Sequence, residues 1–150
     1  MYVDPRGPRF GAAITTAVLA AVLVTGSDTA SGWLLTGQAI VFAIGALAGL
    51  RYAPYGLIYR FLIQPRLAPP TELEAEAPPR FAQGVGLAFA VVGAAGYLTG
   101  VTTLGIVATA AALVAAFLNA FFGLCLGCEV YLLARRVIHT SKPTSKGVTA

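Results

Sequence analysis

Apolar residues dominate four stretches of this chain, and polar segments separate them. At about 1.5 Å per residue, an α-helix of each stretch crosses or nearly crosses the hydrocarbon core of a bilayer. The pattern predicts an all-α integral membrane protein in which four helices form a bundle within a single domain, residues 1–150. The predicted spans are residues 10–25, 33–50, 81–98 and 103–125.

Short turns connect these spans in pairs. Residues 26–32 link the first pair and residues 99–102 link the second, so the bundle is predicted to consist of two helical hairpins. Each hairpin opens with the sequence Pro-Arg-Phe, at residues 8–10 and 79–81. This faint internal repeat predicts that the two hairpins have the same orientation.

The segment between the hairpins has a different pattern. Residues 54–64 lie between two prolines, are too short to cross a membrane and are rich in aromatic residues, which predicts a short helix in the headgroup region. Residues 65–80 combine two Pro-Pro pairs with three glutamates, which is typical of a flexible linker. Residues 138–150 are predicted to be a polar tail.

Composition and charge agree with a membrane location. The 150 residues are 57% hydrophobic and only 11% charged, which excludes an ordinary soluble domain and makes membrane lipid the first expected partner. The net charge of +4 does not indicate nucleic-acid binding, because the basic residues flank the apolar stretches. With four spans, all ten Lys and Arg residues fall on one side, and the opposite turns carry only Asp28. The positive-inside rule then places both termini and the 51–80 loop in the cytoplasm.

Both cysteines of the protein lie in the last apolar stretch, as Cys125-x-x-Cys128 followed directly by Glu129. If the stretch is one continuous helix, these three residues share one flank close to the membrane surface. The opposite flank would offer a groove of small residues to a neighbouring helix. That flank would carry Asn119, Gly123 and Gly127.

The same stretch is too long to be a simple span. A helix over residues 104–137 would measure about 50 Å, which exceeds the hydrocarbon thickness. The helix therefore either emerges from the membrane or breaks, and Gly123 and Gly127 are the two candidate positions.

Two thiols three residues apart can close a disulfide, hold and resolve a persulfide, or supply two ligands to a metal ion. In a continuous helix, however, Cys125 and Cys128 lie toward the C-terminal end, where the helix dipole disfavours a thiolate. An ionised Glu129 would disfavour it further. Activation would need a compensating feature. The candidates are Arg51, Arg60 or Arg80 approaching from the loop, or a helix that restarts at Gly127.

Simpler roles stay open for each of these residues. The cysteines can be small packing residues, and as a zinc site the pair alone lacks two ligands. His139, the single histidine, is predicted to be a solvated tail residue. Glu129 is either an interfacial carboxylate paired with an arginine such as Arg136 or a proton shuttle for thiol exchange. Asn119 is predicted to form a hydrogen bond between helices, with Gln38 as its partner.

Four motifs spread over nearly the whole chain carry a family resemblance. They are Val-Asp-Pro-Arg-Gly-Pro-Arg-Phe at residues 3–10, Pro-Tyr-Gly at 54–56, Pro-Pro-Arg-Phe-Ala-Gln-Gly at 78–84, and Leu-Asn-Ala-Phe-Phe-Gly-Leu-Cys-Leu-Gly-Cys-Glu at 118–129. With these motifs the chain resembles the bacterial membrane proteins of domain-of-unknown-function family 4395. The resemblance implies a location in the bacterial cytoplasmic membrane. Members of this family are often encoded beside thioredoxin-like proteins and thiosulfate sulfurtransferases, which implies thiol or sulfur chemistry.

These observations lead to one leading hypothesis and two alternatives. The leading hypothesis is a membrane dithiol, Cys125 and Cys128, that exchanges electrons or sulfur with a cytoplasmic thioredoxin-like or sulfurtransferase partner, while Glu129 handles protons. The first alternative is a non-enzymatic small subunit or assembly factor that packs in a larger complex or homo-oligomer through its glycine faces. The second is a carrier for a small sulfur anion or metal ion, for which Asn119 and Gln38 are among the few polar groups. No resident metal or cofactor and no nucleic-acid partner are expected.

Overall fold

The structure is a computed structural model that describes residues 2–26, 28–70 and 72–140, with side chains up to Ile138. Most of the polar tail predicted over residues 138–150 therefore lies outside the described residues. The side chain of His139, predicted to be solvated, also lies outside them.

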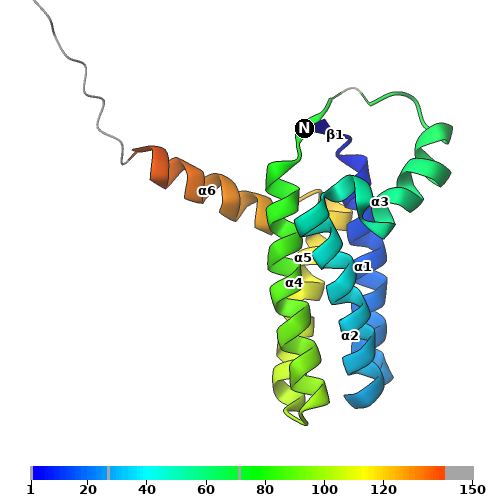
Figure 1. The fold of residues 1–150 in the computed structure, drawn as a ribbon, viewed down its shortest axis with the longest axis vertical. Coiled ribbons are helices and arrows are strands. Elements are labelled where there is room, and N and C mark those ends of the chain that lie inside the picture. The colour runs from blue at the N-terminus through cyan, green and yellow to red at the C-terminus, as the bar shows by residue number, and fades with distance from the viewer. Residues whose placement is uncertain (1, 27, 71, 141–150) are drawn as a thin grey trace, which may run out of the picture.

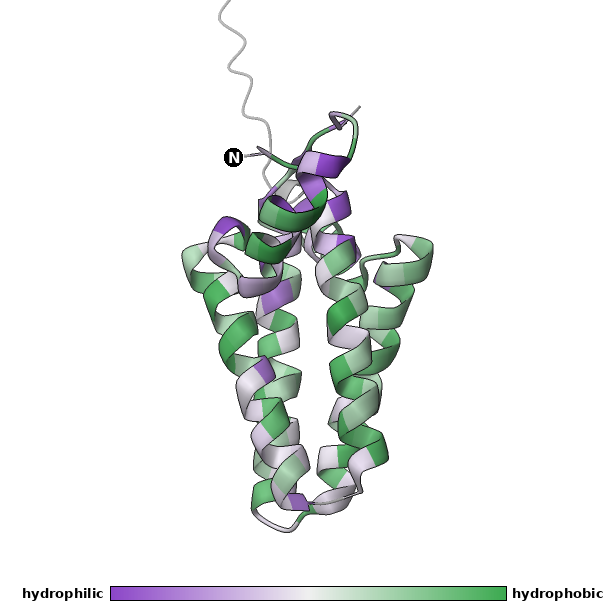
Figure 2. Ribbon diagram, turned by 90° about the vertical axis from the view of Figure 1, so that its right-hand side faces the viewer, coloured by the Kyte–Doolittle hydropathy of each residue, from purple (hydrophilic) through white to green (hydrophobic). Residues whose placement is uncertain are grey.

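Four long helices form the body of the molecule (Figure 1). They are α1 (Arg6–Thr25), α2 (Asp28–Ala43), α4 (Ala77–Leu98) and α5 (Thr102–Phe122), and a π-helix over Ile44–Ala48 extends α2. Each of the four is long and apolar enough to cross a membrane. Apolar residues cover most of their length, and polar residues gather at the end that holds the N-terminus (Figure 2). The predicted all-α four-helix fold is confirmed.

All four helices begin before the apolar stretches from which they were predicted, and α1 and α4 do so through proline-containing turns. α1 begins at Arg6 and α4 at Ala77, each about one turn upstream of the predicted span. Both first turns contain proline: Pro8 in α1, and Pro78 with Pro79 in α4. Proline is tolerated there because the first N–H groups of a helix have no partner within the helix. The polar, proline-containing segments before these two apolar stretches are therefore helical, although the apolar pattern alone predicts a loop there.

The bundle core lies where both hairpins meet. Leu19, Val22 and Leu35 are almost completely buried and cluster with Tyr97. Glycines admit large side chains at the contact between α2 and α4: a Cβ atom at Gly93 would lie 2.9 Å from Cδ1 of Leu35. Close approach through small residues is typical of membrane helix packing.

One buried polar network lies within the bundle. Gln38 is only 2% exposed; its Nε2 donates to Oγ1 of Thr15 at 3.4 Å, and the Tyr55 hydroxyl donates to its Oε1 at 2.8 Å. The predicted pairing of Gln38 with Asn119 is therefore wrong. A buried amide needs partners, and here they come from α1 and from the segment after α2.

That segment is helical over most of its length. It comprises a 3-10 turn (Leu50–Tyr52), α3 (Pro54–Ile58), a π-helix (Tyr59–Ile63) and a second 3-10 turn (Gln64–Arg66).

The connection from this segment to α4 is only partly the open linker that the sequence indicated. The two-residue strand β2 (Glu74–Ala75) pairs antiparallel with β1 (Tyr2–Val3), directly before α4 begins. Glu76 is buried, and its Oε1 accepts a hydrogen bond from the backbone N–H of Leu50 at 3.1 Å. The end of the linker is thus attached to both the N-terminus and the end of the first hairpin.

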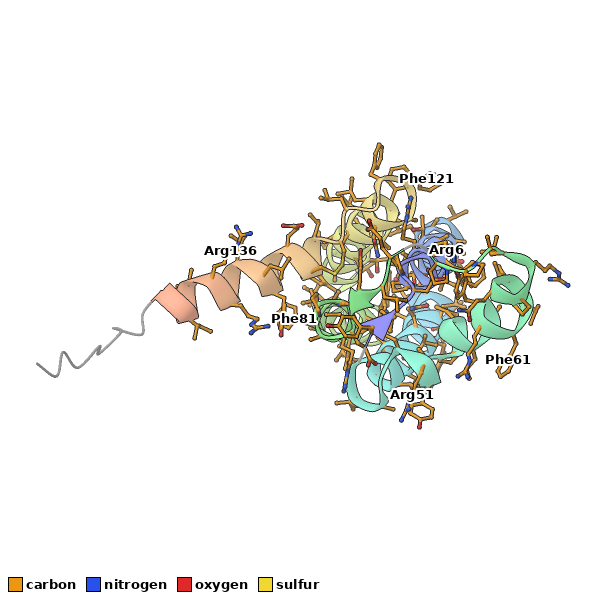
Figure 3. All side chains as sticks on the ribbon, turned by 90° about the horizontal axis from the view of Figure 1, so that it is seen from above. Arg6, Arg51, Phe61, Phe81, Phe121 and Arg136 are labelled. Carbon is orange, nitrogen blue, oxygen red and sulfur yellow. A yellow bond between two sulfur atoms is a disulfide. The ribbon has the colours of Figure 1, made fainter. Side chains whose placement is uncertain are left out.

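The two halves of the chain repeat in space. α6 (Leu126–Thr140) follows α5 as α3 follows α2, and the two extensions leave the bundle on opposite sides (Figure 3). The Phe10 ring contacts that of Tyr59, with centroids 5.9 Å apart, and the Phe81 ring contacts that of Tyr131 at 5.7 Å. Each Pro-Arg-Phe phenylalanine thus fixes the extension of its own half.

The arginines of the two Pro-Arg-Phe motifs act across the halves. Arg80 donates to the carbonyl oxygens of Ala46 and Leu47, at the C-terminal end of the helix formed by α2 and its π-helix. Arg9 lies at the C-terminal end of α5, where a Cβ atom at Gly123 would be 3.7 Å from its Cζ. A cation at a helix C-terminus satisfies or complements its free carbonyl groups, which explains why the motif occurs twice.

Candidate functional site

The site begins where α5 ends. Gly123 adopts a left-handed conformation with φ 69°, and its N–H donates to the carbonyl of Asn119 at 3.1 Å. The N–H of Leu124 donates to the carbonyl of Leu118 at 3.2 Å. The first bond, from the left-handed residue to the carbonyl four residues earlier, is that of an αL helix end, for which glycine is favoured because it adopts positive φ without steric cost. The helix break falls at Gly123, one of the two positions indicated by the sequence.

A new helix starts at once and carries both cysteines. Cys125 immediately precedes the first residue of α6, and Cys128 is the third residue of that helix. The N–H of Glu129 donates to the carbonyl of Cys125 at 3.0 Å, which closes the first turn. A disulfide joins Cys125 and Cys128, whose Cα atoms are 5.2 Å apart. The backbone N–H of Cys128 also lies 3.3 Å from Sγ of Cys125.

This position reverses the electrostatic expectation drawn from a continuous helix. The prediction that the cysteines lie toward a helix C-terminus is wrong, because the break at Gly123 separates them from α5. They lie at the N-terminus of α6, where free N–H groups and the positive end of the dipole stabilise negative charge. Helix N-termini are positions where thiolates are favoured. The shared flank predicted for Asn119, Gly123 and Gly127 also fails, because the break lies between Asn119 and Gly127.

The charged neighbour of the site differs from those expected. Arg80 bonds carbonyl groups of the first hairpin, while Arg51 and Arg60 each lie over the aromatic ring of the next residue. The guanidinium beside the turn is that of Arg9, next to Gly123. Sequence reasoning missed Arg9 because it is more than a hundred residues away. The Pro-Arg-Phe repeat was the available signal.

Glu129 is exposed in the first turn of α6. A carboxylate there interacts favourably with the helix N-terminus, so the residue has a structural reason to be present. Within the described residues, no hydrogen bond joins its carboxylate to either sulfur atom. Its proton-handling role stays a prediction.

Gly127, between the cysteines, fixes α6 against α4. A Cβ atom at this position would lie 2.7 Å from Cα of Ala82. The small-residue surface predicted at Gly127 therefore receives a helix of the same chain. Since Gly127 adjoins Cys128, this contact also positions the cysteine pair.

A cavity of about 310 Å³ borders the site from inside the bundle. It lies among α1, α2, α4, α5 and the start of α6, and Cys125 forms part of its wall. Its walls are mainly alanine and other apolar side chains, with the polar groups of Thr15, Gln83 and Asn119 among them. Both cysteines are half-buried, and they lie where α5 ends and α6 begins.

A second polar cluster organises the N-terminal segment. Asp4 accepts hydrogen bonds from the Arg6 guanidinium at 3.0 Å and from the Tyr59 hydroxyl at 2.9 Å. Burial raises the pKa of Asp4, but these hydrogen bonds outweigh it and hold the pKa below the ordinary value of 3.8. The cluster attaches the start of α1 to the segment after α2, beside a smaller cavity of about 150 Å³.

Metal-ligating residues are scattered in the described part of the chain. Across residues 2–26, 28–70 and 72–140, no three Cys, His, Asp or Glu side chains come together in a group that could hold a metal ion. The arrangement of the described residues thus offers a dithiol, a helix N-terminus and a cavity as its chemical features.

Comparisons with known proteins give one match. No curated protein and no solved structure matches the chain. The family model described as "Domain of unknown function (DUF4395)" matches residues 3–136, which is most of the chain. The resemblance drawn from the four motifs is therefore confirmed, and the chain belongs to the DUF4395 family.

Proposed function

We propose that this protein is a membrane dithiol that exchanges electrons or sulfur with a cytoplasmic thioredoxin-like or sulfurtransferase partner. Cys125 and Cys128 are the reacting pair. The observation that supports this proposal is the position of both cysteines at the N-terminus of α6, with the Cys128 N–H directed at Sγ of Cys125. When the pair is reduced, the same N–H group stabilises a thiolate on Cys125, which is the nucleophile in thiol exchange.

The electron-transfer reaction balances as a dithiol–disulfide exchange. The Cys125 thiolate attacks a disulfide of the partner, and a mixed disulfide forms while one partner thiolate leaves. Cys128 then attacks Sγ of Cys125, which closes the intramolecular disulfide and releases the second partner thiolate. The pair loses two electrons and the partner gains them; the reverse sequence transfers electrons to the protein.

Sulfur transfer uses the same two atoms. The Cys125 thiolate accepts a sulfane sulfur from a partner persulfide, which leaves as a thiolate. Cys128 then attacks Sγ of Cys125, so a disulfide forms and hydrosulfide leaves. In both reactions Glu129 serves as the acceptor of the Cys128 thiol proton, from the first turn of the same helix.

We infer that the site faces the cytoplasm of a bacterium, with both termini and the 51–80 loop on that side of the inner membrane. Supporting this orientation, the arginines lie in the first turns of α1 and α4, in the segment after α2 or on α6, and polar residues gather at that end of the bundle (Figures 1 and 2). Cytoplasmic thioredoxin-like proteins then reach the pair directly.

The alternative of a non-enzymatic subunit needs a sharper test than glycine substitution. Gly127→Leu would disturb the predicted glycine face, but this glycine packs against Ala82 of its own chain. A change there perturbs the fold under either hypothesis. Substitution of the cysteines distinguishes the two hypotheses, because only the dithiol hypothesis requires their thiol groups.

The decisive experiment is differential alkylation of the full chain in native membranes, followed by trapping with a thioredoxin-like protein. We expect Cys128→Ser to accumulate a mixed disulfide through Cys125, and Cys125→Ser to accumulate none. Ala134→Ser, on the exposed surface of α6, is the matched control and should behave as wild type. Two thiols that remain reduced and react slowly, or a double serine variant with full activity in cells, would refute the proposal.

A further inference from the structure

The cavity that Cys125 borders has the size and the mainly apolar walls of a small-molecule site. Its volume of about 310 Å³ lies at the lower end of the range of about 300–1,000 Å³ that small-molecule sites occupy. It lies within the four apolar helices and reaches one sulfur-bearing residue, Cys125. Any molecule that enters it from the membrane must be largely apolar.

Two amide side chains narrow the choice of occupant. Gln83 of α4 and Asn119 of α5 line the cavity. Among the hydrogen bonds of the described residues, neither side-chain amide has a protein partner. This contrasts with Gln38, which bonds both Thr15 and Tyr55. Both side chains are half-buried, so their amide groups are free to bond a ligand that offers hydrogen-bond acceptors or donors.

We propose that the cavity binds the head group of a quinone, which accepts the electrons of the cysteine pair. A quinone ring is apolar over its faces and carries two carbonyl oxygens that accept hydrogen bonds from amide N–H groups. A lipid acyl chain would match the alanine and phenylalanine walls but would leave both amides without a partner. A charged metabolite would match the amides but not the walls.

The position of the two sulfur atoms assigns their roles. Cys125 borders the cavity, whereas Cys128 is not part of its lining. The Cys125 thiolate adds to the quinone ring, and Cys128 then attacks Sγ of Cys125, so the electron pair of the carbon–sulfur bond remains on the ring. One S–S bond forms and two S–H bonds are lost, and two O–H bonds form on the quinol. Two electrons and two protons thus pass from the dithiol to the quinone.

This inference rests on the proposed function, because a partner dithiol must reduce the disulfide again. The two reactions use opposite sides of the pair: the cavity side for the quinone and the polar end for the protein partner. They are therefore separable by substitutions in the cavity.

The test uses the full chain, purified in detergent, reduced, freed of reductant and mixed with decylubiquinone. Quinol formation is followed by absorbance, and disulfide formation by alkylation and mass spectrometry. We expect one quinol for each disulfide formed. Ala115→Phe fills the cavity and should lower the rate at least about tenfold, while Asn119→Leu should raise the half-saturating quinone concentration about tenfold.

Controls distinguish this proposal from the one on which it rests. Val114→Phe adds the same bulk to α5 at an exposed position, 56% accessible, and should leave the rate unchanged. Ala115→Phe should retain normal exchange with reduced thioredoxin, which shows that its site is folded. Normal exchange without quinone reduction in the wild type, or equal quinone rates in both phenylalanine variants, would overturn the quinone site alone. Loss of both reactions in the wild type would overturn the proposed function as well.

Discussion

Gly127→Ala tests whether the α4–α6 contact positions the cysteine pair. The added methyl group would lie 2.7 Å from Cα of Ala82, which is backbone and cannot rotate away. Overpacking of this kind costs about 1–3 kcal/mol. This cost is partly offset, because alanine stabilises a helix by about 0.5–1 kcal/mol relative to glycine. From the middle of each range, the net expectation is a weakening of the α6 contact by about 1 kcal/mol, which is a factor of about 5 in the equilibrium between docked and released α6.

The assay must be local, because α6 packs mainly on α4 and can detach while the bundle stays folded. Hydrogen exchange of α6 amides, measured by mass spectrometry, should accelerate by this factor in Gly127→Ala, while α1 and α5 amides remain protected. Gly84→Ala is the matched control, because a Cβ atom at Gly84 meets nothing within 4 Å. Equal α6 exchange in the two variants would refute the argument that close backbone approach at Gly127 holds the site.

Three further predictions concern the supporting structure. Gly96→Ala places a Cβ atom 2.6 Å from the backbone nitrogen of Gly105, so thermal unfolding in detergent should show a loss of about 1–3 kcal/mol; an unchanged midpoint would contradict the packing. Tyr55→Phe leaves Oε1 of buried Gln38 without its donor and should destabilise the protein by about 1–3 kcal/mol, measured in the same way; a neutral effect would show that another donor replaces it. The folded-state pKa of Asp4 lies below the ordinary value of 3.8, so the stabilisation that its carboxylate contributes is complete above pH 3.8 and is lost as the pH falls through the lower folded-state pKa. Proteolysis of the N-terminal segment should therefore accelerate at that low pH. Asp4→Asn should remove this pH dependence.

The sequence predicted the long helices well because each apolar run has one physical solution in a membrane. It also indicated the repeat and the cysteine pair. It did not decide between Gly123 and Gly127 as the helix break, because glycine is compatible with both a helix end and close packing. The structure uses one for each purpose: Gly123 has positive φ beside Arg9, and Gly127 faces Ala82. Both reasons lie in residues distant along the chain, so local pattern could not supply them.

The same limit explains the errors in electrostatics and pairing. Whether the two thiols lie at the start or the end of a helix depends on a break of three residues. The break decides whether the helix dipole favours or disfavours a thiolate. The partner of Gln38 comes from a segment that looked like a surface helix, since Tyr55 turns its hydroxyl inward. Hydropathy gave no sign of either arrangement.

The two extensions that leave the bundle on opposite sides have a mechanical consequence (Figure 3). In a bilayer, two extensions on opposite sides resist tilting of the bundle. Arg60 and Arg66 lie on the extension of the first half, and Arg135 and Arg136 lie on α6. Tilting the bundle would push one pair of arginines toward the hydrocarbon, at about 2.5–3.5 kcal/mol for each charge that reached its centre, and would lift apolar residues of the other arm into water. These costs oppose tilting of the bundle. They also oppose changes in the depth at which the disulfide between Cys125 and Cys128, where one extension begins, lies in the bilayer.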